Sequence, residues 1–135
     1  MHFHGYEWTG DHARLSAEAE RRPAHASFRA SRLPPICSGD WLAKPPERSL
    51  GRFDAALGAV GWASERYDLI SGAFASEAIV PLKDRQRHAF DVLPLGIDVT
   101  WEEPLYTGLR LMIAVVCCSP NRHSLHPCPA PARRH

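Results

Sequence analysis

The longest uninterrupted apolar stretch of the chain covers 111–118 and holds eight residues without a polar side chain. A strand of this sequence would present Leu111, Ile113, Val115 and Cys117 on one face and Met112, Ala114, Val116 and Cys118 on the other. A strand covered on one side alternates between apolar and polar residues, whereas a strand covered on both sides is apolar throughout. The stretch is too short to cross a bilayer, which requires roughly 20 apolar residues. The pattern therefore predicts a central, buried β-strand.

Strict alternation of apolar and polar residues precedes this stretch, over 97–102. Ile97, Val99 and Trp101 share one face of such a strand, and Asp98, Thr100 and Glu102 share the other. This alternation is typical of a strand with one buried face. Glu103 and Pro104 leave room only for a tight link to the apolar stretch. The two segments are therefore predicted to form an antiparallel hairpin.

A third strand is predicted over 2–8, at the start of the chain. Because side chains alternate along a strand, His2, His4, Tyr6 and Trp8 would lie on one face and Phe3, Gly5 and Glu7 on the other. One face of this strand would thus carry two imidazoles and two aromatic rings in a row.

The clearest helical pattern covers 47–60. Leu50, Phe53, Leu57 and Val60 recur there at intervals of three or four residues and would dock on the sheet. Pro45 and Pro46 suit the entry of a helix, and Gly61 suits its end. A second helix is predicted over 84–92, capped by Asp84 and stopped by Pro94, with Phe90 and Leu93 pointing inward.

Two further segments have weaker patterns. A helix over 12–22 could be capped by Thr9 or Asp11 and closed by Pro23, but its apolar side consists of Leu15 and alanines. The segment 62–81 favours a helix capped by Ser64, with a strand over 67–70 as the alternative.

The rest of the chain has no sustained period. The segment 23–46 contains five prolines and reads as a long connection with at most a short strand near 27–32, so it is a candidate binding or lid segment. After 118 the composition changes to proline, histidine and arginine. We therefore expect one α+β domain over 1–118, with a mostly antiparallel sheet, and a disordered tail over 119–135. A buried strand that leads directly into such a tail raises the hypothesis of an altered or truncated ending.

The composition excludes some classes of partner. The chain has 135 residues, of which 16 are basic and 15 acidic, so its formal charge is only +1. This balance favours neither nucleic acid nor an anionic membrane. Arginine far exceeds lysine, which indicates a GC-rich, bacterial genome. The N-terminus lacks the pattern of a signal peptide, so we expect a cytoplasmic protein with reduced cysteines.

His2 and His4 are the most suggestive candidates for chemistry. Two imidazoles two residues apart on a strand project to one side and can share a metal ion. The arrangement resembles the first strand of amidohydrolase-type sites, although the likeness covers three residues and the chain is too short for a barrel of that kind. Tyr6 and Trp8 continue the same face, so a surface that stacks on a ligand is an equal alternative. The third interpretation is an edge or terminal strand whose aromatic residues are partly solvated and have no binding role.

A second group of potential metal ligands lies near the C-terminus: Cys117, Cys118, His123, His126 and Cys128. These residue types bind zinc, but neighbouring cysteines on a strand point to opposite faces and rarely reach one ion. The group therefore favours two core thiols followed by a tail. The acidic residues Asp98, Glu102 and Glu103 are expected to be ordinary solvated charges of a hairpin.

The sequence contains neither a glycine-rich phosphate loop nor a nucleophile elbow. The predicted function is a binding or interaction module without catalysis or cofactor, whose partner is an unknown protein or small molecule and whose surface is His2, His4, Tyr6 and Trp8. The alternative is a small metal-assisted hydrolase that binds a divalent metal such as zinc at His2 and His4.

Overall fold

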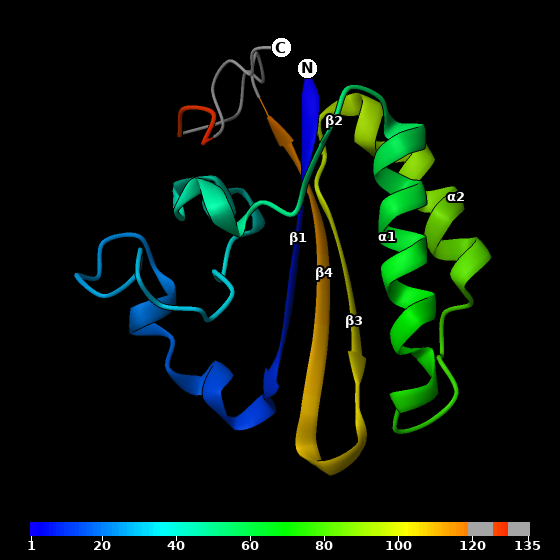
Figure 1. Cartoon of the computed structure of the whole chain (residues 1–135), viewed down its shortest axis with the longest axis horizontal. Coiled ribbons are helices and arrows are strands. Elements are labelled where there is room, and N and C mark those ends of the chain that lie inside the picture. The colour runs from blue at the N-terminus through cyan, green and yellow to red at the C-terminus, as the bar shows by residue number, and fades with distance from the viewer. Residues whose placement is uncertain (119–125, 130–135) are drawn as a thin grey trace.

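The computed structural model describes residues 1–118 and 126–129 of the chain. Its centre is a sheet of four strands in the order β2-β1-β4-β3, and each neighbouring pair is antiparallel. The strands are β1 (His2–Asp11), β2 (Gly51–Phe53), β3 (Val99–Pro104) and β4 (Leu109–Cys118). Two α-helices, α1 (Ala56–Ile70) and α2 (Leu82–Val92), lie on one face of the sheet (Figure 1). The predicted α+β class with an antiparallel sheet is therefore confirmed.

The central strand is β4, as the apolar stretch predicted. It pairs with β1 along ten positions and with β3 along six. Towards the helices, its residues Leu111, Ile113 and Val115 join a core that includes Tyr67 and Leu93. The opposite face of β4 contributes Ala114, Val116 and Cys118 to a smaller core. Both faces of the strand are thus covered.

The second face is covered by irregular chain rather than by an α-helix. The segment before α1 lies on the side of the sheet opposite α1 and α2 (Figure 1). A 3-10 helix over Ser38–Ala43 brings Trp41 and Leu42 against Tyr6, Ala114 and Val116. The predicted long connection therefore exists, and part of it forms the outer layer of the smaller core. The short strand predicted near 27–32 does not form, because this segment is a series of turns.

The predicted helix over 47–60 is wrong in its first half. The chain makes a 3-10 turn over Pro46–Arg48 and then the short edge strand β2. The amide of Leu50 donates to the carbonyl of Gly5 (2.8 Å), and Gly51 lies opposite Gly5 in the sheet. These backbone bonds pair the polar groups that a helix would otherwise pair. The segment therefore forms an edge strand of the sheet rather than a turn of helix. Leu50 and Leu57, expected to dock on the sheet, are exposed.

Helix α1 instead begins at Ala56 and continues to Ile70. The helix favoured within 62–81 is therefore its second half, and the alternative strand over 67–70 is wrong. Ser64 is not a cap, because it lies inside the helix and its hydroxyl donates to the carbonyl of Val60 (2.7 Å). A Cβ atom at position 5 would lie only 2.5 Å from the ring of Trp62, which is too close. Glycine at that position therefore allows α1 to approach β1 closely.

The helix predicted over 12–22 is replaced by two 3-10 turns, His12–Ser16 and Ala19–Arg21. Neither turn buries a residue, so no apolar face stabilises a longer helix. Asp11 does cap the first turn and accepts a hydrogen bond from the amide of Ala13 (2.9 Å).

The helix predicted over 84–92 is confirmed as α2, which begins two residues earlier. Leu93 points inward as expected, but Phe90 is 42% exposed and Ala89 occupies the buried position. The hairpin of β3 and β4 is also confirmed. Its turn lies over Tyr106–Gly108, after the expected link at Glu103 and Pro104, which belong to β3.

Strand β3 begins at Val99, two residues later than predicted, and Ile97 is half-exposed. Among the residues that the structure describes, no helix has the length and apolar character needed to cross a membrane. Of the predicted tail, 119–125 and 130–135 lie outside the described residues, whereas 126–129 lies close to the sheet.

Candidate metal centre

The pairing of β1 with β4 brings the two groups of potential metal ligands together. His2 lies directly opposite Cys118, and His4 lies opposite Val116. Residues opposite each other in an antiparallel pair have their side chains on the same face, about 5 Å apart at Cβ. Cys118 therefore shares the face of His2 and His4, away from the helices. Cys117 points to the helix side and belongs to the larger core, so the prediction that the two cysteines face opposite sides is confirmed.

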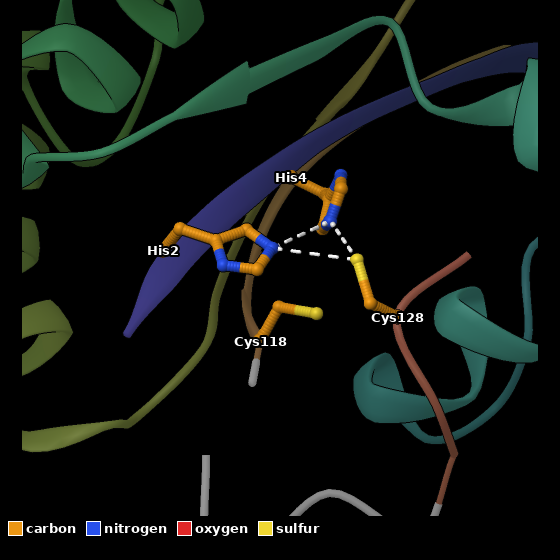
Figure 2. Close-up of side chains that lie close together, drawn as sticks. All are labelled: His2, His4, Cys118 and Cys128. Carbon is orange, nitrogen blue, oxygen red and sulfur yellow. Dashed lines mark hydrogen bonds between the residues drawn. The ribbon is translucent and has the colours of Figure 1, made fainter. Parts of the chain in front are cut away.

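Cys128 completes the cluster from a distant part of the chain. Its Sγ lies 3.5 Å from Nε2 of His2 and 3.5 Å from Nε2 of His4. The two Nε2 atoms lie 3.1 Å apart. Figure 2 shows both imidazoles and both sulfur atoms converging on one point, with Cys128 approaching from a separate segment of chain. The candidate ligand atoms of His2, His4, Cys118 and Cys128 all lie within 4.8 Å of one another.

The segment that carries Cys128 has a second attachment. Nε2 of His126 lies 2.9 Å from a carboxylate oxygen of Asp40, in the 3-10 helix that covers the smaller core. Because His126 and Cys128 are two residues apart, this contact holds the segment where Cys128 meets the sheet. His123, the remaining residue of the predicted C-terminal group, lies outside the described residues.

The spacing of three of the four ligand atoms matches one face of a tetrahedral zinc site, whereas Sγ of Cys118 lies within 4.8 Å of the other three. Zinc binds imidazole nitrogen at about 2.0–2.1 Å and thiolate sulfur at about 2.3 Å. A regular tetrahedron with these bond lengths places two nitrogens roughly 3.3 Å apart and a nitrogen and a sulfur roughly 3.6 Å apart. The corresponding distances between His2, His4 and Cys128 are 3.1, 3.5 and 3.5 Å. Two nitrogen and two sulfur donors are also a set that zinc uses commonly.

His4 is held in the form that a metal requires. Burial, followed by the charges of His2 and Arg52, lowers the pKa of His4 to about 4, so its imidazole is neutral near pH 7. Nδ1 of His4 lies 3.0 Å from the hydroxyl oxygen of Ser49, and that hydroxyl donates to the carbonyl of Gly51 (3.2 Å). With the hydroxyl proton directed at Gly51, Nδ1 of His4 is the donor to Ser49. Its Nε2 then carries a lone pair towards the cluster.

Tyr6 and Trp8 continue the row of His2 and His4 but do not join the cluster. Tyr6 is buried and stacks on Trp41, with ring centroids 4.7 Å apart. Burial, and then Cys118 and Cys128, raise the pKa of Tyr6, which therefore stays protonated. Trp8 is half-buried and lines a separate pocket. The row thus contains two candidate metal ligands, one core residue and one pocket residue, and its role in binding a partner stays a prediction.

The three acidic residues of the hairpin do not converge. Asp98 accepts hydrogen bonds from the amide of Cys117 and the hydroxyl of Ser38, and Glu102 pairs with Arg110. Glu103 was expected to be solvated, which is wrong. It is 5% exposed and accepts hydrogen bonds from Tyr67 (2.6 Å) and Arg85 (2.9 Å). Strand β3 continues past Glu103, and every second side chain of this strand points inward. The carboxylate of Glu103 therefore lies in the core.

Comparison of the chain with models of known families, with curated proteins and with solved structures finds no match. The assignment of the cluster therefore depends on its geometry. In the sequence, these four residues fall into two separate groups of potential ligands, and for Cys118 and Cys128 the prediction favoured a core thiol and a tail residue. The missing information was the pairing of β1 with β4, which sets His2 beside Cys118. The only hint in the sequence was the similar length of the two predicted strands, over 2–8 and 111–118.

Proposed function

We propose that this protein binds one zinc ion at His2, His4, Cys118 and Cys128, and that the ion has a structural role in a non-catalytic binding module. The observation that carries the proposal is the set of distances among His2, His4 and Cys128, which match one face of a tetrahedral zinc site, with Sγ of Cys118 within 4.8 Å of all three ligand atoms. Magnesium and calcium prefer oxygen ligands, so this donor set favours zinc or a similar soft ion.

The charge of the site supports the same conclusion. His4 and Cys118 have no exposed surface, and His2 is 8% exposed. An isolated divalent ion in such a place would be strongly disfavoured by the loss of water. Two thiolates with two neutral imidazoles give the bound ion a net charge of zero. The four ligands therefore compensate the charge that they bury.

The number of protein ligands favours a structural role over catalysis. Catalytic zinc sites typically have three protein ligands and keep the fourth position for water or substrate. Here four side chains surround the same point, and two of them have no exposed surface. The hydrolase alternative would need one of these ligands, most simply Cys128, to stay away from the ion.

Zinc titration of the reduced protein tests the proposal. The protein is purified with a chelator, the chelator is removed, and zinc binding is followed by calorimetry with elemental analysis. We expect one ion per chain, with Cys118→Ser and Cys128→Ser each weakening binding at least about tenfold. Cys37→Ser is the matched control, because Cys37 is exposed and outside the cluster.

Two results would contradict the proposal. One is absence of stoichiometric zinc binding in protein whose thiols are shown to be reduced. The other is stoichiometric binding that neither Cys118→Ser nor Cys128→Ser weakens. Binding that depends on His2, His4 and Cys118 but not on Cys128 would reject the closed site and favour the hydrolase alternative.

A further inference from the structure

A second site lies farther along β1, on the same face of the sheet as the metal cluster. It is a pocket of about 250 Å³ lined by Glu7, Trp8, Thr9, Arg32, Trp41 and Arg48. Trp8 is four residues from His4, which corresponds to about 13 Å along a strand. The pocket is therefore distinct from the metal cluster, and its lining combines two indole rings with two guanidinium groups.

The aromatic wall of the pocket is fixed by packing. Trp41 is buried, and its ring stacks on Tyr6 with an interplanar angle of 12°. The ring of Trp8 lies over Gly10, so closely that a Cβ at position 10 would be 2.4 Å from it. Trp8 also packs against the smaller core. Both indoles are thus held in place before any ligand arrives, which reduces the entropy lost on binding.

The basic wall is anchored to neutral groups. Arg48 donates to the carbonyls of Ser31 (2.8 Å) and Ala30 (3.1 Å). The neighbouring Lys44 is buried, and its ammonium donates to the carbonyls of Phe28 (2.7 Å) and Ser31 (2.9 Å). These carbonyls orient the cations but carry no charge. The positive charge of this wall is therefore not neutralised by the groups that hold it.

The one acid in the lining is engaged elsewhere. Glu7 points to the helix face of β1, where Arg66 of α1 binds its carboxylate through two hydrogen bonds of 2.6 and 3.2 Å. Arg32 and Arg48 line the same pocket, and burial followed by the charge of Arg32 lowers the pKa of Arg48. Glu47 offsets part of this charge but does not line the pocket.

We propose that this pocket binds a small anion that carries a planar ring, such as an aromatic carboxylate or phosphate. A guanidinium group binds either anion through two parallel hydrogen bonds, and an anion would relieve the repulsion between Arg32 and Arg48. The half-buried indole of Trp8 provides apolar surface for the ring, and the buried Trp41 completes that wall. Pockets for drug-sized ligands span roughly 300–1,000 Å³, so this smaller pocket suits a single ring.

Calorimetry with four single-ring probes tests this inference: benzoate, phenyl phosphate, the neutral benzamide and the cationic benzylammonium. We expect 1:1 binding of the two anions with a dissociation constant of about 1 mM or tighter, and binding of the neutral and cationic probes at least about tenfold weaker. Arg32→Gln and Trp8→Leu should each weaken anion binding at least about tenfold. Arg87→Gln, an exposed arginine on α2, is the matched control and should bind as the wild type does.

Arg32 is exposed, so loss of its charge leaves the fold intact, and circular dichroism checks this for each variant. No binding of either anion at about 10 mM would overturn the inference, as would equal binding of benzoate and benzamide. Anion binding that persists in Arg32→Gln and Trp8→Leu would place the bound anion outside this pocket and would also overturn the inference. None of these outcomes depends on whether zinc occupies the proposed cluster.

Discussion

Ser49 determines how His4 presents its ligand atom, although Ser49 itself is not a ligand. Its hydroxyl lies 3.0 Å from Nδ1 of His4 and donates to Gly51, which leaves Nε2 of His4 without a proton. Groups that orient a metal ligand in this way typically change affinity by about 10–100-fold when removed.

Ser49→Ala should therefore weaken zinc binding by about tenfold or more while the protein stays folded, because the imidazole loses its fixed tautomer and orientation. Zinc titration against a competing chelator measures the change. Ser71→Ala is the control, since Ser71 bonds only the carbonyl of Asp68 at an exposed helix end. Equal affinity of the Ser49→Ala variant and the wild type would show that the hydroxyl does not orient His4.

At the scale of elements, β4 determines the architecture because it is buried on both faces and paired on both edges. Val115 is 1% exposed on the face that meets the helices, while Leu109, at the start of the same strand, is 37% exposed. The two positions offer a direct comparison of a central and a peripheral site within one strand.

Val115→Asp should abolish soluble expression, because an unpaired carboxylate at this position would be buried in the larger core. Leu109→Asp, the matched control, should remain soluble and fold cooperatively. Expression and thermal unfolding measure both variants. A soluble Val115→Asp protein with a cooperative transition would contradict the central position of β4.

Local patterns predicted the strands better than the helices. The apolar run 111–118 and the alternation in 2–8 and 97–102 depend on burial of whole faces, which the sheet preserves. Leu50 and Leu57 fit a helical period by spacing alone, yet both are exposed. The start of the predicted helix is a strand instead, because β2 pairs with β1 at Gly51. That pairing joins residues far apart in the sequence, so no local period could reveal it.

Part of the candidate site was predictable for the same reason: local patterns reveal neighbours along a strand but not contacts between distant parts of the sequence. His2 and His4 were predicted as candidate metal ligands because period-2 geometry is local. Their partners were not, because Cys118 arrives through the β1–β4 pairing and Cys128 through a further segment. The residue types indicated possible metal binding, and tertiary contacts determined which of these residues lie in one cluster.

At the scale of the whole molecule, the proposed ion joins both ends of the chain. His2 and His4 lie on the first strand, Cys118 ends the last strand, and Cys128 lies beyond it. A ligand that binds only the folded state stabilises that state in proportion to the logarithm of its concentration over its dissociation constant. The ion is therefore expected to stabilise the sheet and the segment 126–129 together.

Deletion of 121–135 tests this coupling. Deletion of a disordered tail, as expected over 119–135, would leave the melting temperature unchanged. The contacts of His126 and Cys128 change that expectation. We now expect a small effect without zinc and a loss of several degrees with zinc present, because the deleted chain lacks one ligand. Equal melting temperatures of the full and shortened chains in saturating zinc would show that Cys128 does not hold the ion.

X-ray absorption spectroscopy of the zinc-loaded, reduced protein tests the central claim most directly, because it reports the atoms bound to the ion. We predict two sulfur neighbours at about 2.3 Å and two nitrogen neighbours at about 2.0–2.1 Å. Cys128→Ser should remove one sulfur neighbour, and Cys37→Ser should change nothing. A first shell of nitrogen and oxygen without sulfur would contradict the proposed centre.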